Sequence, residues 1–368
     1  VVAVVGLLSG SAHAQDGDQP APPPPAAPAE PAKPAKHANK IECEVITPGT
    51  LRSRRHINLP GVKVNLPALT AKDLADVKVG LEMEVDFIAL SFVREARDIL
   101  QLRELTAGAK HPPQIVAKIE DQQAVKNLTG IIEVSDAIMV ARGDLGIECP
   151  YEELPIIQRR VVKACIQIGK PVIVATHMLE SMIENPMPTR AEITDVANAV
   201  FEQADAIMLS GETTVGRYPL KCIEVFDRIS QRIERSGGAR FHEAATLDNT
   251  RQKLIKSAVV MANELKAEGM LVFTLNGSLA RYASWLRPHQ STIHAVCRTP
   301  QLARSLALRW GIQSVVMPFT QKDSDARIDD ALRAVVDKSH LKKGDHVVIV
   351  SSITAGDKIA DAIQWREI

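Results

Sequence analysis

The run IMVARGDLGIE, residues 138–148, joins an uninterrupted apolar segment directly to an arginine, a glycine and an aspartate. The apolar part, residues 137–141, has neither the alternation of a half-exposed strand nor the length of a helix. It is typical of a strand covered on both faces, as in a parallel sheet packed under helices. Gly143 and Gly146 allow a sharp turn, so Asp144 is predicted just past the carboxyl end of the strand, where parallel α/β folds bind ligands.

Four other segments have a similar composition and recur at intervals of about 25 to 35 residues, as parallel βα units do. Helix-like sequence lies between them, for example in residues 151–169, where apolar side chains are spaced three and four apart and a glycine ends the run. This alternation predicts a (β/α) barrel or a doubly wound parallel sheet. The four segments are residues 86–92 (DFIALSF), 114–119 (QIVAKI), 171–175 (PVIVA) and 206–209 (AIML).

Polar side chains follow every one of these strand-like segments. This favours a barrel, because the carboxyl ends of barrel strands converge on one mouth. Lys118 and Glu120 are two positions apart on an extended chain, so their side chains are expected to share one face. The residues at the five strand ends are Ser91 and Arg94, Lys118 and Glu120, Arg142 and Asp144, Thr176, and Ser210 and Glu212.

Two carboxylates and one lysine at this mouth suggest a metal site for a phosphorylated ligand. Glu120 and Asp144 would supply two oxygen ligands to a hard divalent ion such as Mg²⁺. Lys118 adds a mobile positive charge suited to a phosphoryl group in transit, and the backbone at Gly143 opens a helix whose N–H groups could hold a carboxylate. The alternative is a Lys118–Glu120 ion pair at a strand end with Asp144 as an ordinary N-cap. As a set from adjacent strands, the residues favour the metal site.

Composition excludes several classes of partner. Lysine plus arginine and aspartate plus glutamate each number 44, so the formal net charge is zero, and neither nucleic acid nor a membrane surface is indicated. The five cysteines have no CxxC spacing, which argues against a disulfide framework or a zinc site and for buried free thiols.

The first 40 residues differ from the rest of the chain. Residues 1–14 (VVAVVGLLSGSAHA) look like the apolar core and cleavage site of a secretory signal peptide, and they are too short to span a membrane. Residues 15–40 are rich in proline and alanine, which predicts an extended and largely disordered linker. The alternative is a gene-model or fusion artefact.

Residues beyond 249 alternate between helical and strand-like patterns again, which predicts a second α/β domain. Helices are expected in residues 250–269, 300–311 and 328–341, and strands in residues 270–275, 292–298, 313–319 and 345–352.

Three long stretches resemble pyruvate kinases in order and spacing: AKIEDQQAV (117–125), residues 135–162 around ARGDLGIE, and residues 169–219, which contain PMPTRAEITDVANAV. The resemblance extends from near Ile41 to the end of the chain. It implies transfer of the phosphoryl group of phosphoenolpyruvate to ADP, giving pyruvate and ATP, the closing step of glycolysis. Lys118 would stabilise the transferring phosphoryl group and the enolate, and Glu120 and Asp144 would bind Mg²⁺ or Mn²⁺. Positions near the substrate carboxylate and the proton-delivery side would be Ala141, Arg142, Gly143 and Thr176.

The resemblance also divides the chain. We expect a signal-peptide-like segment (1–14), a linker (15–40), a remnant of the lid domain (41–62), a partial (β/α) barrel carrying the catalytic residues (63–236) and a C-terminal α/β domain (237–368). The expected fold class is therefore α/β, an incomplete TIM-type barrel followed by a C-terminal α/β domain. The family's first three barrel strands, most of its lid and its K⁺ ligands are not found in this sequence.

Five strands of eight cannot close a barrel, because closure fixes strand number and tilt together. We therefore expect little kinase activity from the isolated chain. Two alternatives remain open: a non-catalytic remnant or exported metal- or phosphate-binding protein, and a chimeric gene product.

The family is usually homotetrameric and cytoplasmic, whereas a genuine signal peptide in residues 1–14 would imply a secreted or periplasmic protein. Many members bind a sugar phosphate effector in the C-terminal domain. The matching positions here are Thr274, Asn276, Gly277 and Ser278, although an ordinary turn with Ser278 near a helix start is the alternative.

Overall fold

A computed structural model describes residues 5–6, 36–37, 40–41, 44–46, 48–50, 58, 60–61, 67–319, 324–336, 341–355 and 358–368. The chain divides into two compact units, one of Val1–Ser9 with Asn58–Ile368 and one of Gly10–Ile57. The expectations for residues 1–14, 15–40 and 41–62 lie almost wholly outside the described residues, apart from short strands such as β2 (Lys36–His37), which pairs antiparallel with β3 (Lys40–Ile41). In the described part of the chain, none of the helices has the length and apolarity needed to cross a bilayer.

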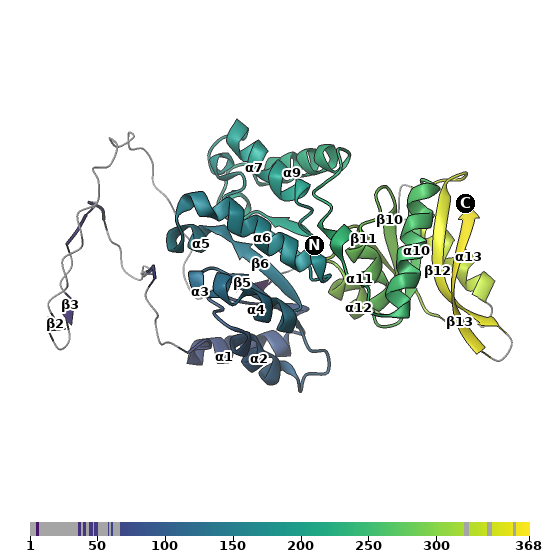
Figure 1. The fold of residues 1–368 in the computed structure, drawn as a ribbon, viewed down its shortest axis with the longest axis horizontal. Helices are drawn as coiled ribbons and strands as arrows, with labels where there is room; N and C mark the ends of the chain where they lie inside the picture. Colours follow the sequence, from purple (N-terminus) through teal and green to yellow (C-terminus); the bar gives the residue numbers. More distant parts are fainter. Residues whose placement is uncertain are drawn as a thin grey trace. The chain divides into compact units, whose positions relative to one another are not determined.

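The first large sheet has six strands, all parallel, in the order β1-β4-β5-β6-β7-β8 (Figure 1). Within the described residues this sheet is open, with β1 and β8 as its edges. The prediction of an α/β fold with an incomplete barrel-type sheet is confirmed. The strands are β1 (Val5–Gly6), β4 (Phe87–Leu90), β5 (Gln114–Ile119), β6 (Ala137–Ala141), β7 (Val172–Ala175) and β8 (Ala206–Met208).

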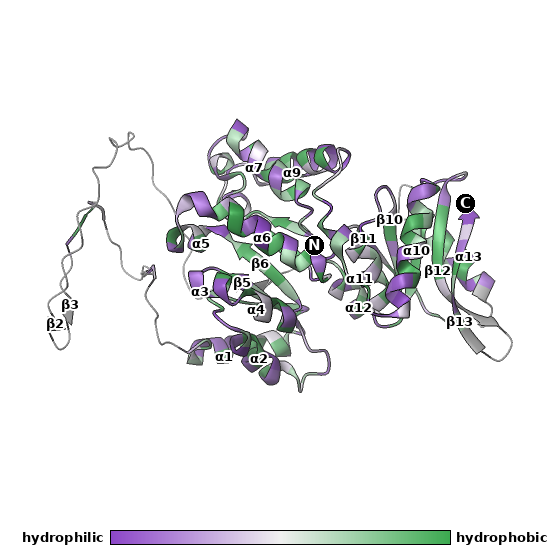
Figure 2. Cartoon of the chain, in the orientation of Figure 1, coloured by the Kyte–Doolittle hydropathy of each residue, from purple (hydrophilic) through white to green (hydrophobic). Residues whose placement is uncertain are grey.

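Both faces of this sheet are buried, as the apolar run before Asp144 predicts. In β6, Ile138 and Val140 pack in the larger core beneath the helices, whereas Met139 packs in a second cluster on the opposite face with Val116 and Ile173. Strands β5 and β6 are accordingly mostly hydrophobic (Figure 2).

The helices around this sheet begin where the sequence supplies caps. Thr70 and Thr189 each form a capping box with an acidic residue three positions on, which fixes the start of a helix. The elements are α1 (Ala71–Glu82), α2 (Ala96–Thr106), α3 (Gln122–Lys126), α4 (Leu128–Val134), α5 (Arg142–Glu148), η1 (Tyr151–Glu153), α6 (Leu154–Gln167), η2 (Glu180–Ile183), α7 (Arg190–Phe201), α8 (Gly211–Thr214), α9 (Pro219–Glu234) and η3 (Phe241–Ala244).

The second large sheet has the order β11-β10-β9-β12-β13, parallel except for the β12–β13 pair. Helices α10 and α11 pack on one face and α13 on the other (Figure 1). The elements are α10 (Thr250–Glu264), β9 (Gly269–Thr274), α11 (Ser278–Trp285), β10 (Thr292–Cys297), α12 (Pro300–Ser305), β11 (Ile312–Val316), α13 (Ser324–Val336), β12 (His346–Ala355) and β13 (Lys358–Glu367).

The second sheet and its helices differ from the sequence prediction in several element ends and in one added strand. Helix α10 ends at Glu264 rather than at residue 269, and α13 begins at Ser324 rather than at residue 328. The helix expected over residues 300–311 ends at Ser305, and Leu308 instead packs with Val116, Met139 and Ile173 of the first sheet. The edge strand β13 was not predicted. The free thiols are confirmed for Cys149, Cys165, Cys222 and Cys297, all buried, whereas Cys43 lies outside the described residues.

Candidate active site

Lys118 and Glu120 lie together at the carboxyl end of β5, on one face as their spacing predicts. Nζ of Lys118 is 2.6 Å from Oε1 of Glu120 and donates to Oγ of Ser91 at 2.8 Å. The backbone N–H of Phe92 donates to Oε2 of Glu120 at 2.6 Å. Phe92 has a φ of 52°, a left-handed conformation that is uncommon for a bulky residue. The end of β4 is therefore bent so that it contacts both members of the ion pair.

The Glu120 carboxylate is fully buried. Burial raises its pKa above the ordinary value, Lys118 and the Phe92 N–H oppose that rise, and the negative charge of Asp144 adds to it. Among these influences, that of Asp144 is the smallest. Asp144 is the third residue of α5, whose N-cap is Ala141, so Asp144 is not an ordinary N-cap. Across the residues that the structure describes, no cluster of three or more acidic, histidine or cysteine side chains is arranged to hold a metal.

Thr176 links the ends of β6 and β7. Its Oγ1 accepts a hydrogen bond from the backbone N–H of Gly143 at 2.8 Å and donates to the Ala175 carbonyl at 2.6 Å. One of the helix-opening N–H groups expected to meet a substrate carboxylate is therefore bound to a side chain in this structure.

Arg142 is buried and its guanidinium contacts other protein groups. Nη1 pairs with Oδ1 of Asp195 at 2.7 Å and donates to Oε1 of Gln158 at 3.3 Å. Nη2 donates to the Thr176 carbonyl at 2.6 Å. The sequence predicted that Arg142 follows the end of β6. It gave no indication that Asp195 of α7 and Gln158 of α6 would contact Arg142, because the three residues meet only after folding.

Glu212 lies in α8, just after β8, and its carboxylate accepts hydrogen bonds from two nearby loops. Its Oε1 accepts from the Leu179 N–H at 3.0 Å and its Oε2 from the Ser210 N–H at 2.7 Å. Its carboxylate therefore braces two loops of the same sheet edge.

The matching edge of the second sheet is a tight turn. Thr274 ends β9, and its buried Oγ1 has no hydrogen-bond partner among the described residues. Oδ1 of Asn276 accepts from the Ser278 N–H at 3.1 Å. Gly277 has a φ of 85° and caps α11, which Ser278 begins. The local geometry is that of a strand-to-helix turn.

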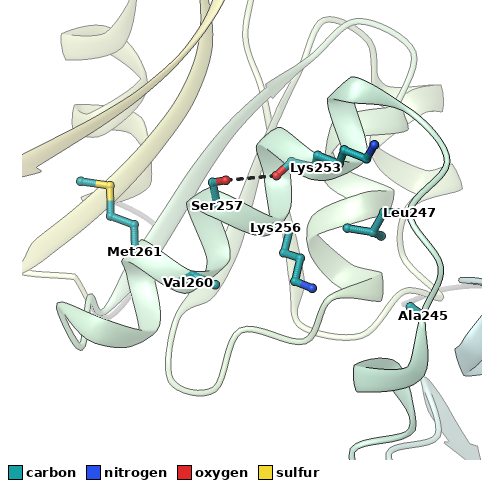
Figure 3. Close-up of a pocket in the computed structure, with 7 residues that line it drawn as sticks. All are labelled: Ala245, Leu247, Lys253, Lys256, Ser257, Val260 and Met261. Atoms are coloured by element: carbon teal, nitrogen blue, oxygen red, sulfur yellow. Dashed lines mark hydrogen bonds between the residues drawn. The ribbon is translucent and has the colours of Figure 1, made fainter.

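A hollow of about 710 Å³ runs along α10 and the segment before it. Figure 3 shows the seven residues that line it, with Oγ of Ser257 donating to the Lys253 carbonyl one turn back in the same helix. None of the charged residues at the ends of β5 to β7 lines it. The lining residues are Ala245, Leu247, Lys253, Lys256, Ser257, Val260 and Met261.

Comparison with known proteins gives a consistent family match. The family model described as pyruvate kinase, barrel domain, matches residues 32–223, and that described as pyruvate kinase, alpha/beta domain, matches residues 252–363. The pyruvate kinase of Staphylococcus aureus (strain USA300) is 38% identical over 331 residues, covering 87% of this chain and 55% of that protein. A pyruvate kinase of Staphylococcus epidermidis is 39% identical over 328 residues, with the same shares covered. The chain thus spans about half the length of the curated relatives it matches.

Proposed function

The chain belongs to the pyruvate kinase family, and we propose that it transfers the phosphoryl group of phosphoenolpyruvate to ADP, giving pyruvate and ATP. The observation that carries this proposal is the Lys118–Glu120 pair, 2.6 Å apart at the carboxyl end of β5 and held by Ser91 and the Phe92 N–H. Phosphoryl transfer depends mainly on positioned charge. A largely buried lysine fixed between a carboxylate and a hydroxyl supplies such a charge.

Lys118 is the residue that we assign to the transferring phosphoryl group. Its ammonium is held by Ser91 and Glu120 and is largely shielded from water, so its field is strong and little reorganisation is needed during the reaction. We assign Thr176 to the side on which the enolate is protonated, with Oγ1 as the atom that would hold the proton. Ala141, Arg142 and Gly143 shape the strand end that faces the substrate carboxylate.

The carboxylates fit a divalent cation. Glu120 and Asp144 follow the neighbouring strands β5 and β6 and offer carboxylate oxygens, and Mg²⁺ commonly takes one or two carboxylates and completes its shell with substrate oxygens. Glu120 and Asp144 would hold Mg²⁺ or Mn²⁺, which when bound would neutralise charge on the phosphoryl and substrate oxygens. We assign no residues to K⁺.

The test is a coupled assay of the purified chain with phosphoenolpyruvate, ADP, Mg²⁺ and K⁺. Lys118→Met should lower kcat about a thousandfold, as expected for loss of a preorganised charge. The matched control is Lys163→Met on the exposed face of α6, which should leave kcat unchanged. Turnover that survives Lys118→Met intact would rule out the proposed role.

A second candidate is a metal- or phosphate-binding protein without turnover, which the open edge of the first sheet favours. Calorimetry separates the two: Mn²⁺ binding that depends on Glu120 and Asp144, without any pyruvate formed, would support the second candidate.

We also propose a homotetramer in the cytoplasm, as the family implies, and a sugar phosphate as the ligand of the Thr274–Ser278 turn. Sedimentation analysis tests the assembly. Mass spectrometry of the native N-terminus tests the location, since cleavage after Ala14 would indicate a secreted or periplasmic protein instead.

A further inference from the structure

The turn after β7 has an unusual backbone. Thr176 and His177 have φ values of 70° and 51°, so two consecutive residues with side chains adopt the left-handed conformation. That conformation is unfavourable for residues other than glycine, and most of all for a β-branched one such as threonine. It persists only where the surrounding structure enforces it.

The guanidinium of Arg142 lies against this turn. Nη2 donates to the carbonyls of Thr176 at 2.6 Å and His177 at 3.3 Å. Nε donates to the carbonyls of Thr176 at 3.2 Å and Ala175 at 3.4 Å. Three successive carbonyls therefore face one planar cation, which is the group best suited to bind several acceptors at once.

The remaining nitrogen of Arg142 is held from the opposite side. Nη1 pairs with Asp195 at 2.7 Å and contacts Gln158 at 3.3 Å. Nε2 of Gln158 in turn donates to Glu202 at 3.0 Å, and the buried Glu202 carboxylate also accepts from Nε of Arg159 at 3.0 Å. Helices α6 and α7 thus fix the orientation of the guanidinium.

We propose that Arg142 is a positioning residue that holds the Thr176–His177 turn left-handed and so keeps Oγ1 of Thr176 on the amide of Gly143. The inference deepens the proposed function, since it identifies what places the Thr176 hydroxyl at the site. The position of the Thr176 hydroxyl can be tested whether or not the protein forms pyruvate. Arg142 acts through Thr176 and need not touch the substrate.

The test is hydrogen exchange of the Gly143 amide, monitored by NMR on the full ¹⁵N-labelled chain. Arg142→Met should speed this exchange at least about tenfold, roughly the value of one hydrogen bond, while amides within β6 keep their protection. Arg142→Lys, which keeps the charge but loses the planar fork, should give a smaller increase. Arg159→Met is the matched control, because it contacts Glu202 in the same network without touching the turn, and it should leave Gly143 unchanged.

A rescue experiment separates enforced backbone conformation from general loss of structure. Glycine adopts a left-handed φ readily, so adding His177→Gly to Arg142→Met should restore at least part of the Gly143 protection, and His177→Gly alone should not reduce it. If Arg142→Met speeds exchange at all amides alike, the Asp195→Asn variant tests the proposal instead. Its neutral amide holds the guanidinium less firmly, so exchange of the Gly143 amide should be about threefold faster. Unchanged exchange in Asp195→Asn would then overturn the proposal.

Turnover gives an independent reading. If the protein forms pyruvate, Arg142→Met should lower kcat more than it raises the KM for phosphoenolpyruvate, because a misplaced Thr176 affects the reaction rather than binding. If the wild-type chain forms none, the proposed function fails, yet exchange at Gly143 still decides the positioning role. Gly143 exchange that stays the same in a folded Arg142→Met protein overturns the positioning role whatever the activity.

Discussion

The two parallel sheets end very differently at their carboxyl edges. The first places an ion pair there, Lys118 with Glu120, and puts a left-handed backbone on Thr176, which has a side chain. The second ends in a turn without a carboxylate, where Asn276 accepts from the Ser278 amide, Arg281 donates to the Asn276 carbonyl, and the left-handed position is taken by Gly277. The same strand-to-helix connection is thus built with backbone strain and a buried ion pair in one sheet and without them in the other.

This difference supports placing the proposed site at the first sheet. Unfavourable backbone and buried charge are retained only when other interactions enforce them, and such features concentrate at functional sites. In the first sheet the enforcing groups are present, because Ser91 and Phe92 hold the ion pair and Arg142 holds the turn after β7. Four predictions test the comparison, in order of decreasing effect.

The largest effect is expected from Glu120→Gln. It removes a carboxylate from the proposed cation site and leaves Lys118 without its counter-charge, so Mn²⁺ affinity should fall about a thousandfold, more than the 10–100-fold typical of an outer-shell change. Calorimetry measures it. The control is Glu212→Gln, a buried carboxylate at the same sheet edge that binds only loop amides in the described structure. Equal losses of Mn²⁺ affinity in both variants would mean that Mn²⁺ binds through the general negative charge of this sheet edge and not at Glu120.

The second prediction concerns the boundary between the two sheets. Asp205, before β8, accepts hydrogen bonds from Nη2 of Arg287 at 3.0 Å and from the backbone N–H groups of Val172 and Trp310 at 3.0 and 3.1 Å. Asp205→Ala removes the acceptor of three donors, two of them on the buried residues Val172 and Arg287, and should lower the free energy of unfolding by about 3 kcal/mol. Arg287→Met leaves Asp205 two of its donors and should cost only about 1 kcal/mol. Denaturant titration measures both, and the reverse order would show that the cation is the essential partner.

The third prediction uses a buried histidine of the second sheet. Burial lowers the pKa of His294, in β10, from 6.5 to about 4, and its Nε2 has no hydrogen-bond partner in the described part of the chain. The unfolded chain binds a proton near pH 6.5 and the folded chain only near pH 4, so stability is complete above pH 6.5 and falls as the pH drops. At about pH 5 the loss should be about 2 kcal/mol, because one pKa unit corresponds to about 1.4 kcal/mol.

Thermal unfolding between pH 7 and 5 measures this loss. His294→Leu should remove roughly half of the pH dependence due to buried histidines, because the pKa of His242 is also lowered to about 4, by burial and then by the charge of Arg287. An unchanged pH profile in His294→Leu would show that this histidine gains a partner or water on folding.

The sequence predicted those elements whose signal is local. Strands β5 and β6 match their predicted bounds because each is a continuous apolar run between turn residues. Strand β13 was missed because KIADAIQWRE is an edge strand with polar residues scattered along it, and it is held by pairing with β12. The helix after Pro300 stops early because burial of Leu308 against the first sheet outweighs its local helical pattern.

The same distinction applies to the site. The spacing of Lys118 and Glu120 is enough to put them on one face, and the ion pair follows. The direction of the Arg142 side chain depends on how α6 and α7 dock, which no local pattern records. The left-handed turn at Thr176 could not be predicted from the sequence either, because neither Thr176 nor His177 is a residue that favours this conformation.

The smallest effects test the comparison most directly. They come from placing a side chain at the left-handed position of the second sheet and a glycine at a left-handed position of the first. Gly277→Ala should lower the free energy of unfolding by about 1 kcal/mol, since alanine is strained at a positive φ and its Cβ would lie 2.9 Å from Nη2 of Arg281. His177→Gly should change it by less than about 0.5 kcal/mol, because relief of the left-handed strain is offset by greater freedom of the unfolded chain. The exposed His177–Glu180 pair, 3.8 Å apart, adds little.

Denaturant titration of both variants gives the comparison. A loss for Gly277→Ala with no change for His177→Gly means that the first sheet carries backbone strain that the second avoids. Equal losses would mean that His177 stabilises its turn through its side chain. The left-handed backbone after β7 would then be an ordinary local preference, and it would no longer distinguish the edge that carries Lys118 from the edge that carries Gly277.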